Sequence, residues 1–505
     1  DPEDSLWFPA ADADTDWLAR PPPSWAAHEE VQALLVLPLY PQHACMGEGG
    51  FDPGDAAIAE RMWSGGFRGL RQLQAFAVPS AGNPEQDEMK KAVARALREY
   101  NRVTDTAGRC LEPPALVRLP VVEGGSGLRL ALGSCHYPPG ILNELPAQAS
   151  WTRLNARLDG AVSERPQLLV LTGDQVYADA TAGLFDPSQA DDRFRKPYET
   201  WLRNRQVRDT LRRLPLVAML DDHEIDDNWE PLGPAAPAEA RELNRQRCDR
   251  GVRYFQRFQR LRQATPDASG PLWSIVKHLD VPMFLVDTRT QRCCRATGMP
   301  ATGPEALLGR EQWTALRDWL MDSPRDRPRL IVSPSLLLPR HRDAAPAVLA
   351  TGVHDSADRA ARRADGWSGY PDACCALLDW IAGQQIHGVV FLSGDEHLGL
   401  HANASISRNG QPAVTVHSIH APGLNSPYRF ANARPADFIL DENFLFRSNG
   451  VENHCELQTR VFEGAGFAHI SLQPDSNGKG WTLACEFDAE GGGAARRWSI
   501  HLPMG

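Results

Sequence analysis

The sequence predicts an α/β fold, in which short apolar strands form a sheet covered by helices. Between residues 128 and 397, runs of three to four apolar residues alternate with segments of helical periodicity. Four of these runs end abruptly in residues that carry chemistry. Because open α/β sheets hold ligands at the carboxyl ends of their strands, these four ends predict the position of a site.

The four strand ends share one pattern, an apolar strand that opens into small and ionisable residues. The runs are 130–132, 168–171, 217–220 and 389–392. They lead, in that order, into Cys135 and His136, into Asp174 and Tyr177, into Asp221, Asp222, His223 and Glu224, and into Asp395 and His397. We therefore expect one metal site assembled from four loops.

The other elements follow in chain order. We expect helices at 149–158, 198–214, 238–263, 310–320 and 372–385, and further strands at 283–286 and 330–332. After residue 413 the chain changes to short strands separated by turns, at 413–419, 467–473, 480–488 and 496–502. This last part predicts antiparallel pairing.

Residues 1–125 read differently from the rest. The opening is rich in Pro and Asp, and a helix is expected over 85–101, where Met89, Val93 and Leu97 share one face. No catalytic pattern is present. We interpret 1–125 as an extension, lid or small domain, and 126–505 as the catalytic domain, with a hinge at 123–127.

Composition and net charge narrow the class of protein. Lys and Arg number 53 and Asp and Glu 64, which gives a net charge of −11 with no basic block, so a nucleic-acid groove is not indicated. An acidic chain needs local positive charge to act on phosphates, and bound metal ions would supply it.

No apolar run approaches the roughly 18 residues of a membrane span. Ten cysteines, some in adjacent pairs, favour a reducing compartment such as the cytoplasm, with export left open. The oligomeric state is not readable from the sequence.

Phosphate ester hydrolysis explains why these residue types converge. Two metal ions about 4 Å apart lower the pKa of water and clamp the attacking and leaving oxygens. We assign Asp174 as the bridging ligand and Asp221 and Asp222 to metal, while Asp395 and His397 close the centre. His223 would stabilise the transition state or protonate the leaving group.

Two candidate ligands keep an alternative reading. Tyr177 is either a phenolate ligand of trivalent iron or an ordinary core tyrosine. Cys135 is either a thiolate ligand of a transition metal or a small buried hydrophobe.

With those residues in hand, the chain resembles the alkaline phosphatase D (PhoD-like) family of calcineurin-type metallophosphoesterases. The motifs that carry the resemblance are GSCHY at 133–137, GDQVYAD at 173–179, DDHEIDDNW at 221–229, VDTRTQR at 286–292, GWSGYP at 366–371 and SGDEH at 393–397. They span about 270 residues in the expected order.

The resemblance implies a four-layer α/β/β/α sandwich, here with a partly helical N-terminal extension, and phosphomonoesterase or phosphodiesterase activity. It also implies trivalent iron on Cys135, Asp174 and Tyr177, with calcium in the remaining positions on Asp222, Asp395 and His397. Mn, Mg, Zn or Co remain open. Asp222, in place of the Asn of commoner metallophosphoesterases, favours a harder metal such as calcium.

A second set of residues is predicted to contact the substrate: His136, His223, Arg289, His417 and His420. Arg289 would either bind a phosphate oxygen or hold its own loop through Asp287, and we include it with His223 and Asp222 in the catalytic set. His417 and His420 are three residues apart, so a regular strand turns them to opposite faces unless His420 lies past its end.

The sequence thus predicts a metal-dependent phosphoric ester hydrolase that acts on a small phosphoester with a metal-activated hydroxide. Two alternatives stay open: a phosphodiesterase of phospholipase D type, and a catalytically silent metal-binding module.

Overall fold

The computed structural model divides the chain into two compact units, and the larger one contains residues 122–201, 218–255 and 267–505. The smaller contains 1–121, 202–217 and 256–266. The structure describes the following residues: 31–36, 46–47, 50–51, 77–79, 115–117, 127–138, 144–180, 190–211, 213–214, 216–259, 271–276, 281–295, 302–342, 366–427, 432–476, 478, 480–489 and 496–504.

The first sheet of the larger unit has eight strands, in the order β16-β17-β13-β14-β12-β11-β10-β9. Their bounds are β9 Ser274–Val276, β10 Met283–Leu285, β11 Arg329–Val332, β12 Val389–Ser393, β13 Gly399–Arg408, β14 Val414–His420, β16 Asp441–Ser448 and β17 Val451–Phe462. Strands β10, β11, β12 and β14 run parallel, and the remaining strands pair antiparallel. Four parallel strands therefore bring their carboxyl ends to one edge.

The second sheet has seven strands, in the order β20-β19-β18-β6-β7-β8, with β15 paired to β6. The bounds are β6 Leu128–His136, β7 Leu168–Leu171, β8 Leu216–Ala218, β15 Gly423–Asn425, β18 Gly466–Pro474, β19 Gly480–Ala489 and β20 Arg497–Pro503. All four residues of β7 are buried, as expected of a strand covered on both faces.

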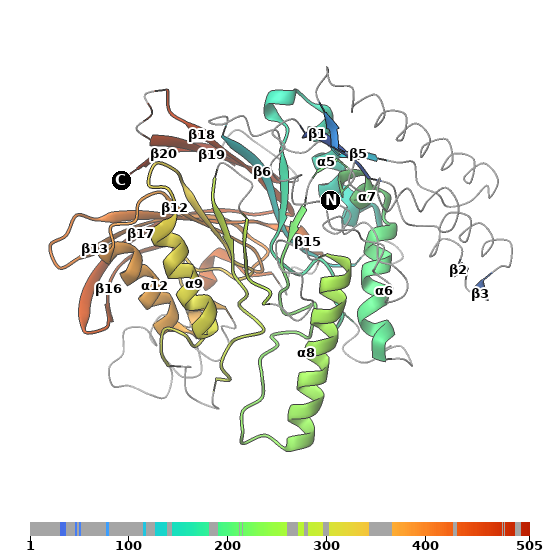
Figure 1. The fold of residues 1–505 in the computed structure, drawn as a ribbon, viewed down its shortest axis with the longest axis horizontal. Helices are drawn as coiled ribbons and strands as arrows, with labels where there is room; N and C mark the ends of the chain where they lie inside the picture. The colour runs from blue at the N-terminus through green and yellow to red at the C-terminus, as the bar shows by residue number, and fades with distance from the viewer. Residues whose placement is uncertain are drawn as a thin grey trace. The chain divides into compact units, whose positions relative to one another are not determined.

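Helices cover the outer face of each sheet (Figure 1). On the first sheet these are α9 (Gly309–Asp322) and α12 (Pro371–Gly383), whose apolar sides join the strands in one core that includes Trp313 and Leu377. Helix α12 begins with Pro at its first position, where the missing N–H costs nothing. On the second sheet, α5 (Glu144–Asp159) is fixed by Arg157, which pairs with Glu486 of β19 at 3.0 Å.

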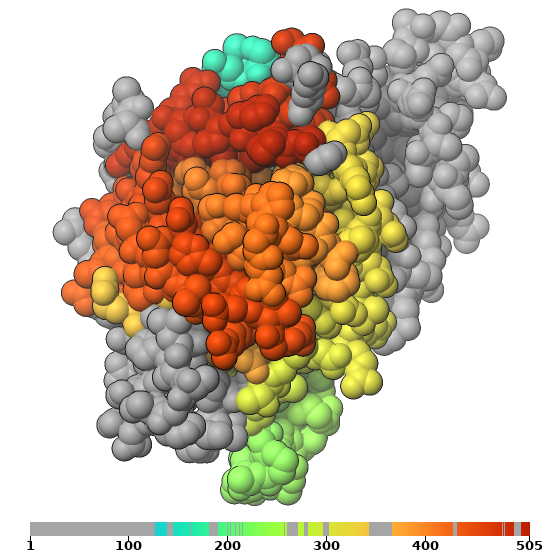
Figure 2. Space-filling view, turned by 90° about the vertical axis from the view of Figure 1, so that its left-hand side faces the viewer, coloured from blue at the N-terminus to red at the C-terminus, as the bar shows by residue number. Residues whose placement is uncertain are grey.

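The inner faces of the two sheets pack on each other through aromatic rings. The ring of Trp498 on β20 stacks on His401 of β13 and on Phe462 of β17, with centroid distances of 4.8 and 5.2 Å. Helix, sheet, sheet and helix thus form four layers, which confirms the predicted α/β/β/α sandwich. On the face drawn in Figure 2, orange and red C-terminal segments lie next to one another.

In the described part of the chain the remaining helices are α6 (Ala190–Arg203), α7 (Arg205–Leu211) and α8 (Ala238–Phe258), with short 3-10 turns η3 (Val162–Glu164), η4 (Trp367–Gly369) and η5 (Pro435–Asp437). The single helix predicted over 198–214 is wrong, because Asn204 interrupts it and its Oδ1 accepts the N–H of Gln206 at 2.9 Å. No helix in the described part of the chain is long and apolar enough to cross a membrane.

In the first 121 residues the structure describes only short strands. They are β1 (Val31–Val36), β4 (Ala77–Pro79) and β5 (Ala115–Val117), which pair in the order β4-β1-β5, and β2 (Met46–Gly47) with β3 (Gly50–Phe51). The helix predicted over 85–101 lies outside the described residues.

Candidate metal centre

The predicted strand ends converge on one place, where β6, β7 and β8 of one sheet meet β12 of the other. Strand β6 extends to His136, so Cys135 and His136 lie at the end of this strand rather than in the loop expected after it. The N–H of His136 donates to the carbonyl of Asp174 at 2.7 Å, which joins this strand end to the β7 loop. The N–H of Asp395 donates to Ser134 Oγ at 3.0 Å, which joins the β12 loop to β6 across the two sheets. The N–H of Ala178 donates to the carbonyl of His223 at 2.9 Å, which joins the β8 loop to the β7 loop, so the four strand ends form one assembly.

The backbone of this assembly is strained. Cys135, Asp174, Asp395 and His397 all have positive φ, of 45°, 58°, 99° and 59°. A left-handed conformation costs a non-glycine residue about 1–3 kcal/mol, and such costs cluster at ligand-binding positions. The surrounding hydrogen bonds hold these residues in conformations that aim their side chains at a common centre.

Four carboxylates form the core of the site. Each of Asp174, Asp221, Asp222 and Asp395 offers an oxygen, and these oxygens all lie within 4.8 Å of one another. Asp174 Oδ1 is buried and accepts no hydrogen bond from any described residue. Burial, followed by the negative charge of Asp222, raises the pKa of Asp174 well above its ordinary value. Such a cluster favours bound cations, because they compensate the charges that the acids impose on one another.

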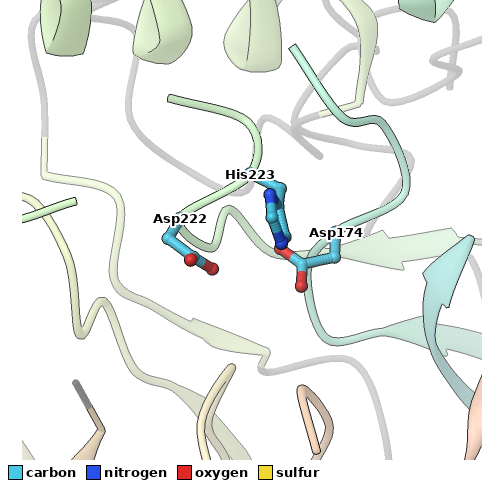
Figure 3. A group of neighbouring side chains, drawn as sticks. All are labelled: Asp174, Asp222 and His223. Atoms are coloured by element: carbon cyan, nitrogen blue, oxygen red, sulfur yellow. The ribbon is translucent and has the colours of Figure 1, made fainter. Parts of the chain in front are cut away.

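Imidazole and carboxylate approach the same space from different loops. Asp174 and Asp222 extend toward each other, with the ring of His223 beside them (Figure 3). Each of the three offers a ligand atom within 4.8 Å of the other two.

Arg289 lies behind the carboxylates. Its side chain is fully buried, its Nε pairs with Asp221, and an η nitrogen lies 3.4 Å from Asp222 Oδ1. Burial alone would raise the pKa of Asp222, but the charge of Arg289 and that of His223 hold it at about 2. Asp222 is therefore ionised at neutral pH, ready to bind a cation.

Cys135, Tyr177 and His397 surround the carboxylates. Cys135 Sγ lies 3.5 Å from Asp174 Oδ2, and the Tyr177 hydroxyl lies 3.4 Å from His397 Nε2. His397 Nδ1 lies 2.8 Å from Asn432 Oδ1, so Nδ1 carries the proton and Nε2 keeps its lone pair for the centre. Burial and neighbouring ionisable groups raise the pKa of Tyr177 well above its ordinary value, so its phenolate requires a cation nearby.

His223 is held in one orientation. Its Nδ1 lies 2.9 Å from both carboxylate oxygens of Asp179, and its ring lies against Tyr177 with centroids 4.1 Å apart. Burial by itself would lower the pKa of His223, but Asp222, Asp174 and Asp179 raise it well above its ordinary value. With Nδ1 bound to Asp179, Nε2 is the nitrogen left to act on a ligand.

A cavity of about 340 Å³ opens above these groups. Six predicted site residues line it: Asp174, Tyr177, Asp222, His223, Asp395 and His397. The other described lining residues include Ser335, His341, Ser368, Asn432 and Phe438. The cavity therefore has a charged floor and a mixed rim of polar and aromatic side chains.

The structure does not bring four of the predicted substrate contacts to this cavity. His136 points beneath α5, where its Nε2 lies 3.1 Å from the carbonyl of Ala147. The Arg289 side chain stays behind the carboxylates and pairs with Asp221 and Asp222, while its backbone N–H donates to Asp287 Oδ1 at 2.9 Å. His417 lies between the sheets, with its ring 5.7 Å from that of His401.

His420 is the last residue of β14 rather than one past its end. Its Nδ1 lies 2.8 Å from Ser393 Oγ, and its Nε2 accepts the N–H of Glu396 at 3.2 Å. Both ring nitrogens are therefore used to hold the loop that carries Asp395 and His397. A side chain on the inner face of a covered strand can lie either in the layer between the sheets or in the cavity at the end of the strand. The alternation of side chains along a strand does not distinguish these two places.

Glu224, the fourth residue of DDHE, has a role that its sequence pattern did not predict. It is fully buried, and its carboxylate accepts backbone N–H groups from two of the loops. The sequence feature that could have indicated this role is a glutamate that follows three ionisable residues at a strand end.

This fold and this centre define a class of protein: a metallophosphoesterase, that is, a phosphoester hydrolase. The family model of the PhoD-like phosphatase matches residues 151–474. The chain therefore belongs to the PhoD-like phosphatase family, as the resemblance predicted.

Solved structures are similar to this chain, and the likeness to PhoD shows the same fold. A structure of PhoD matches with a TM-score of 0.50 and 16% identity, over 78% of this chain and 72% of that one. A purple acid phosphatase, PPD1, from yellow lupin (Lupinus luteus) seeds has a TM-score of 0.45 and 9% identity, over 78% and 57%. No curated protein matches the sequence.

The residues present fit metal ions. Carboxylates suit hard cations such as calcium, and imidazole suits transition metals such as iron. The buried Asp174 Oδ1 without a hydrogen-bond donor and the mutual proximity of four carboxylates are the observations that support this fit.

Proposed function

We propose that the chain hydrolyses small phosphoesters with His223 as the proton donor to the leaving oxygen, and with Asp174, Asp221, Asp222, Asp395, His397, Tyr177 and Cys135 as the metal-binding set. When bound, the metal ions would supply counter-charge to the phosphoryl oxygens and lower the pKa of the attacking water. Trivalent iron would be bound by Cys135 and Tyr177, and calcium is the second metal proposed.

The observation that carries the proposal is the convergence of four carboxylates from three separate loops on the floor of a cavity. Their oxygens lie within 4.8 Å of one another, and three of the four residues line the cavity. An ester phosphate in this cavity would lie over the floor, with its organic group toward the rim of Ser335, His341 and Phe438.

His223 has the geometry of a proton donor. Asp179 fixes its Nδ1 and favours the protonated ring, and the side chain lines the cavity. A positioned acid of this kind contributes about 10²–10⁴ in rate when the leaving group is a poor one.

Substitution of the floor tests the function. Asp174→Asn and Asp222→Asn should each lower the turnover of a 4-nitrophenyl phosphoester by at least about 10³-fold, because each removes a metal-binding oxygen. Asp318→Asn, at an exposed position on α9, is the matched control and should retain full activity. Far-ultraviolet circular dichroism establishes that all variants are folded.

Each outcome has a definite meaning. Full activity in a folded Asp174→Asn or Asp222→Asn variant would contradict the site assignment. A wild-type protein that binds metal and hydrolyses neither mono-aryl nor bis-aryl phosphates would instead favour the silent module. The ratio of the rates on those two esters measures preference for monoester or diester.

A further inference from the structure

A single buried carboxylate joins two of the loops that form the centre. Glu224 Oε2 accepts the N–H of Asp174 at 3.0 Å and the N–H of Asp221 at 2.8 Å. Its Oε1 accepts the N–H of Gln175 at 2.9 Å and that of Val176 at 3.3 Å. Four backbone donors thus converge on one side chain, three from the β7 loop and one from the β8 loop.

These donors belong to segments outside the sheet ladders. β7 ends at Leu171 and β8 at Ala218, so the residues that carry Asp174 and Asp221 are not fixed by strand pairing. Asp174 also has a left-handed backbone, with φ of 58°. A buried Asp174 N–H without an acceptor would add to that strain. The Glu224 carboxylate accepts this N–H.

Glu224 is itself held firmly. Helix α8 approaches so closely at Gly251 that a Cβ there would lie 2.6 Å from the Glu224 carbonyl oxygen. The side chain is 0% exposed and is not among the residues that line the cavity. Glu224 therefore contacts the backbone of the centre and stays away from a ligand in the cavity.

We propose that Glu224 is a positioning residue whose carboxylate sets the separation of the Asp174 and Asp222 loops and so determines how tightly the centre holds metal. This inference rests on the proposed function, because it assumes that the carboxylates bind metal. It adds a separate claim: metal affinity depends on a group that touches neither metal nor substrate.

The geometry explains why glutamate is required. Glutamine has the same shape but replaces one oxygen with an NH₂ group, so two of the four N–H groups would face a donor. Aspartate is shorter by one methylene and cannot reach both loops from the same backbone position. Groups that support metal ligands in this way are typically worth about 10–100-fold in metal affinity.

The test compares metal affinity in two folded variants with buried carboxylates. Glu224→Gln removes the proposed clamp. Asp379→Asn removes a carboxylate that is also buried, pairs with Arg408 at 3.1 Å and accepts Asn453 Nδ2 at 3.0 Å, far from the centre in α12. Each chelator-stripped full-length protein is titrated with calcium and, separately, with manganese by calorimetry, and its Tm is recorded without metal.

The expected result is a 10–100-fold weaker metal affinity for Glu224→Gln, with most of kcat recovered at saturating metal and KM little changed. Asp379→Asn should show a lower Tm and an unchanged metal affinity. A folded Glu224→Gln variant whose metal affinity lies within twofold of wild type would overturn the proposal. If wild type itself bound no metal, the proposed function would fail first, so the two failures are distinguishable.

Hydrogen exchange on the wild-type protein gives a result even if Glu224→Gln fails to fold. The amides of Asp174, Gln175 and Asp221 lie outside helices and strands, yet they should be protected as strongly as those of β7. Rapid exchange of these amides would contradict a clamp at Glu224.

Discussion

At the scale of single residues, the centre pairs each reactive group with one that fixes its orientation. Asp179 holds His223 through Nδ1, and Asn432 holds His397 in the same way. Arg289 compensates Asp221 and Asp222 from behind. Removing an orienting group should therefore change the rate of reaction more than it changes the fold.

Asp179→Asn tests this at His223, the proposed proton donor. The amide oxygen still accepts the Nδ1 proton, but the negative charge that favours protonated His223 is lost. We expect kcat to fall about 10–100-fold on an alkyl phosphoester, whose leaving group needs a proton. On a 4-nitrophenyl ester, which departs without one, the loss should be several-fold smaller. Equal losses on both esters would assign Asp179 a purely structural role.

At the scale of elements, the parallel strands were predictable and several hairpins were not. Continuous apolar runs such as 168–171 and 389–392 predicted β7 and β12, and the residues after them formed the centre. Strands β13, β16 and β17 were missed, because their polar residues on the inner sheet face weaken the apolar signal. The two hairpins they form turn at Asn409-Gly410 and Asn449-Gly450, where φ is positive at all four residues. The Asn-Gly pair was the available signal.

Gly394 shows why an element ends where it does. A Cβ there would collide with Ser134 Oγ and with Thr172 Oγ1, so only glycine lets the β12 loop close on β6 and β7. Gly394→Ala should displace Ser134, whose hydroxyl holds the Asp395 amide, and should lower phosphoesterase activity by at least about tenfold.

Gly410→Ala is the control for that substitution. Gly410 has φ of 74° and no heavy atom within 4 Å of a built Cβ, so the change carries only the backbone cost of about 1 kcal/mol. It should lower Tm slightly and leave activity intact. A fully active Gly394→Ala variant would contradict the close approach of these loops.

At the scale of the whole molecule, several neutral histidines are buried in the interior of the sandwich. Burial lowers the pKa of His417 and His136 to about 4, and that of His401 and His469 to about 3. The unfolded chain binds protons at these residues below about pH 6.5, whereas the folded chain does not. Their contribution to stability is therefore complete above pH 6.5 and is lost as the pH falls toward 4.

His417→Gln tests that dependence. Each pKa unit corresponds to about 1.4 kcal/mol, so wild type should lose several kcal/mol of unfolding free energy between pH 7.5 and pH 5. Urea unfolding of His417→Gln should show a smaller loss over the same interval, since glutamine does not titrate. Identical pH slopes in the two proteins would show that His417 is not buried in its neutral form.

The four-layer architecture and the family were predictable from the order of the motifs, because five of the six lie at or just after a strand end. The sixth, GWSGYP, forms η4 and the start of α12. The positions of His417 and His420 could not be predicted, because the same side chains fit the layer between two sheets and the cavity at the ends of the strands. The role of Glu224 could not be predicted either, because it depends on backbone N–H groups whose positions a sequence does not show.

The claim that the four strand ends bind metal ions is tested by elemental analysis of the purified protein together with its visible spectrum, for wild type and for Asp222→Asn. We expect at least two metal ions per wild-type chain, fewer in the variant, and a visible absorption band from iron bound by tyrosinate. An active wild-type protein without stoichiometric metal would contradict the metal centre, and an active, colourless, iron-free protein would contradict the roles of Tyr177 and Cys135.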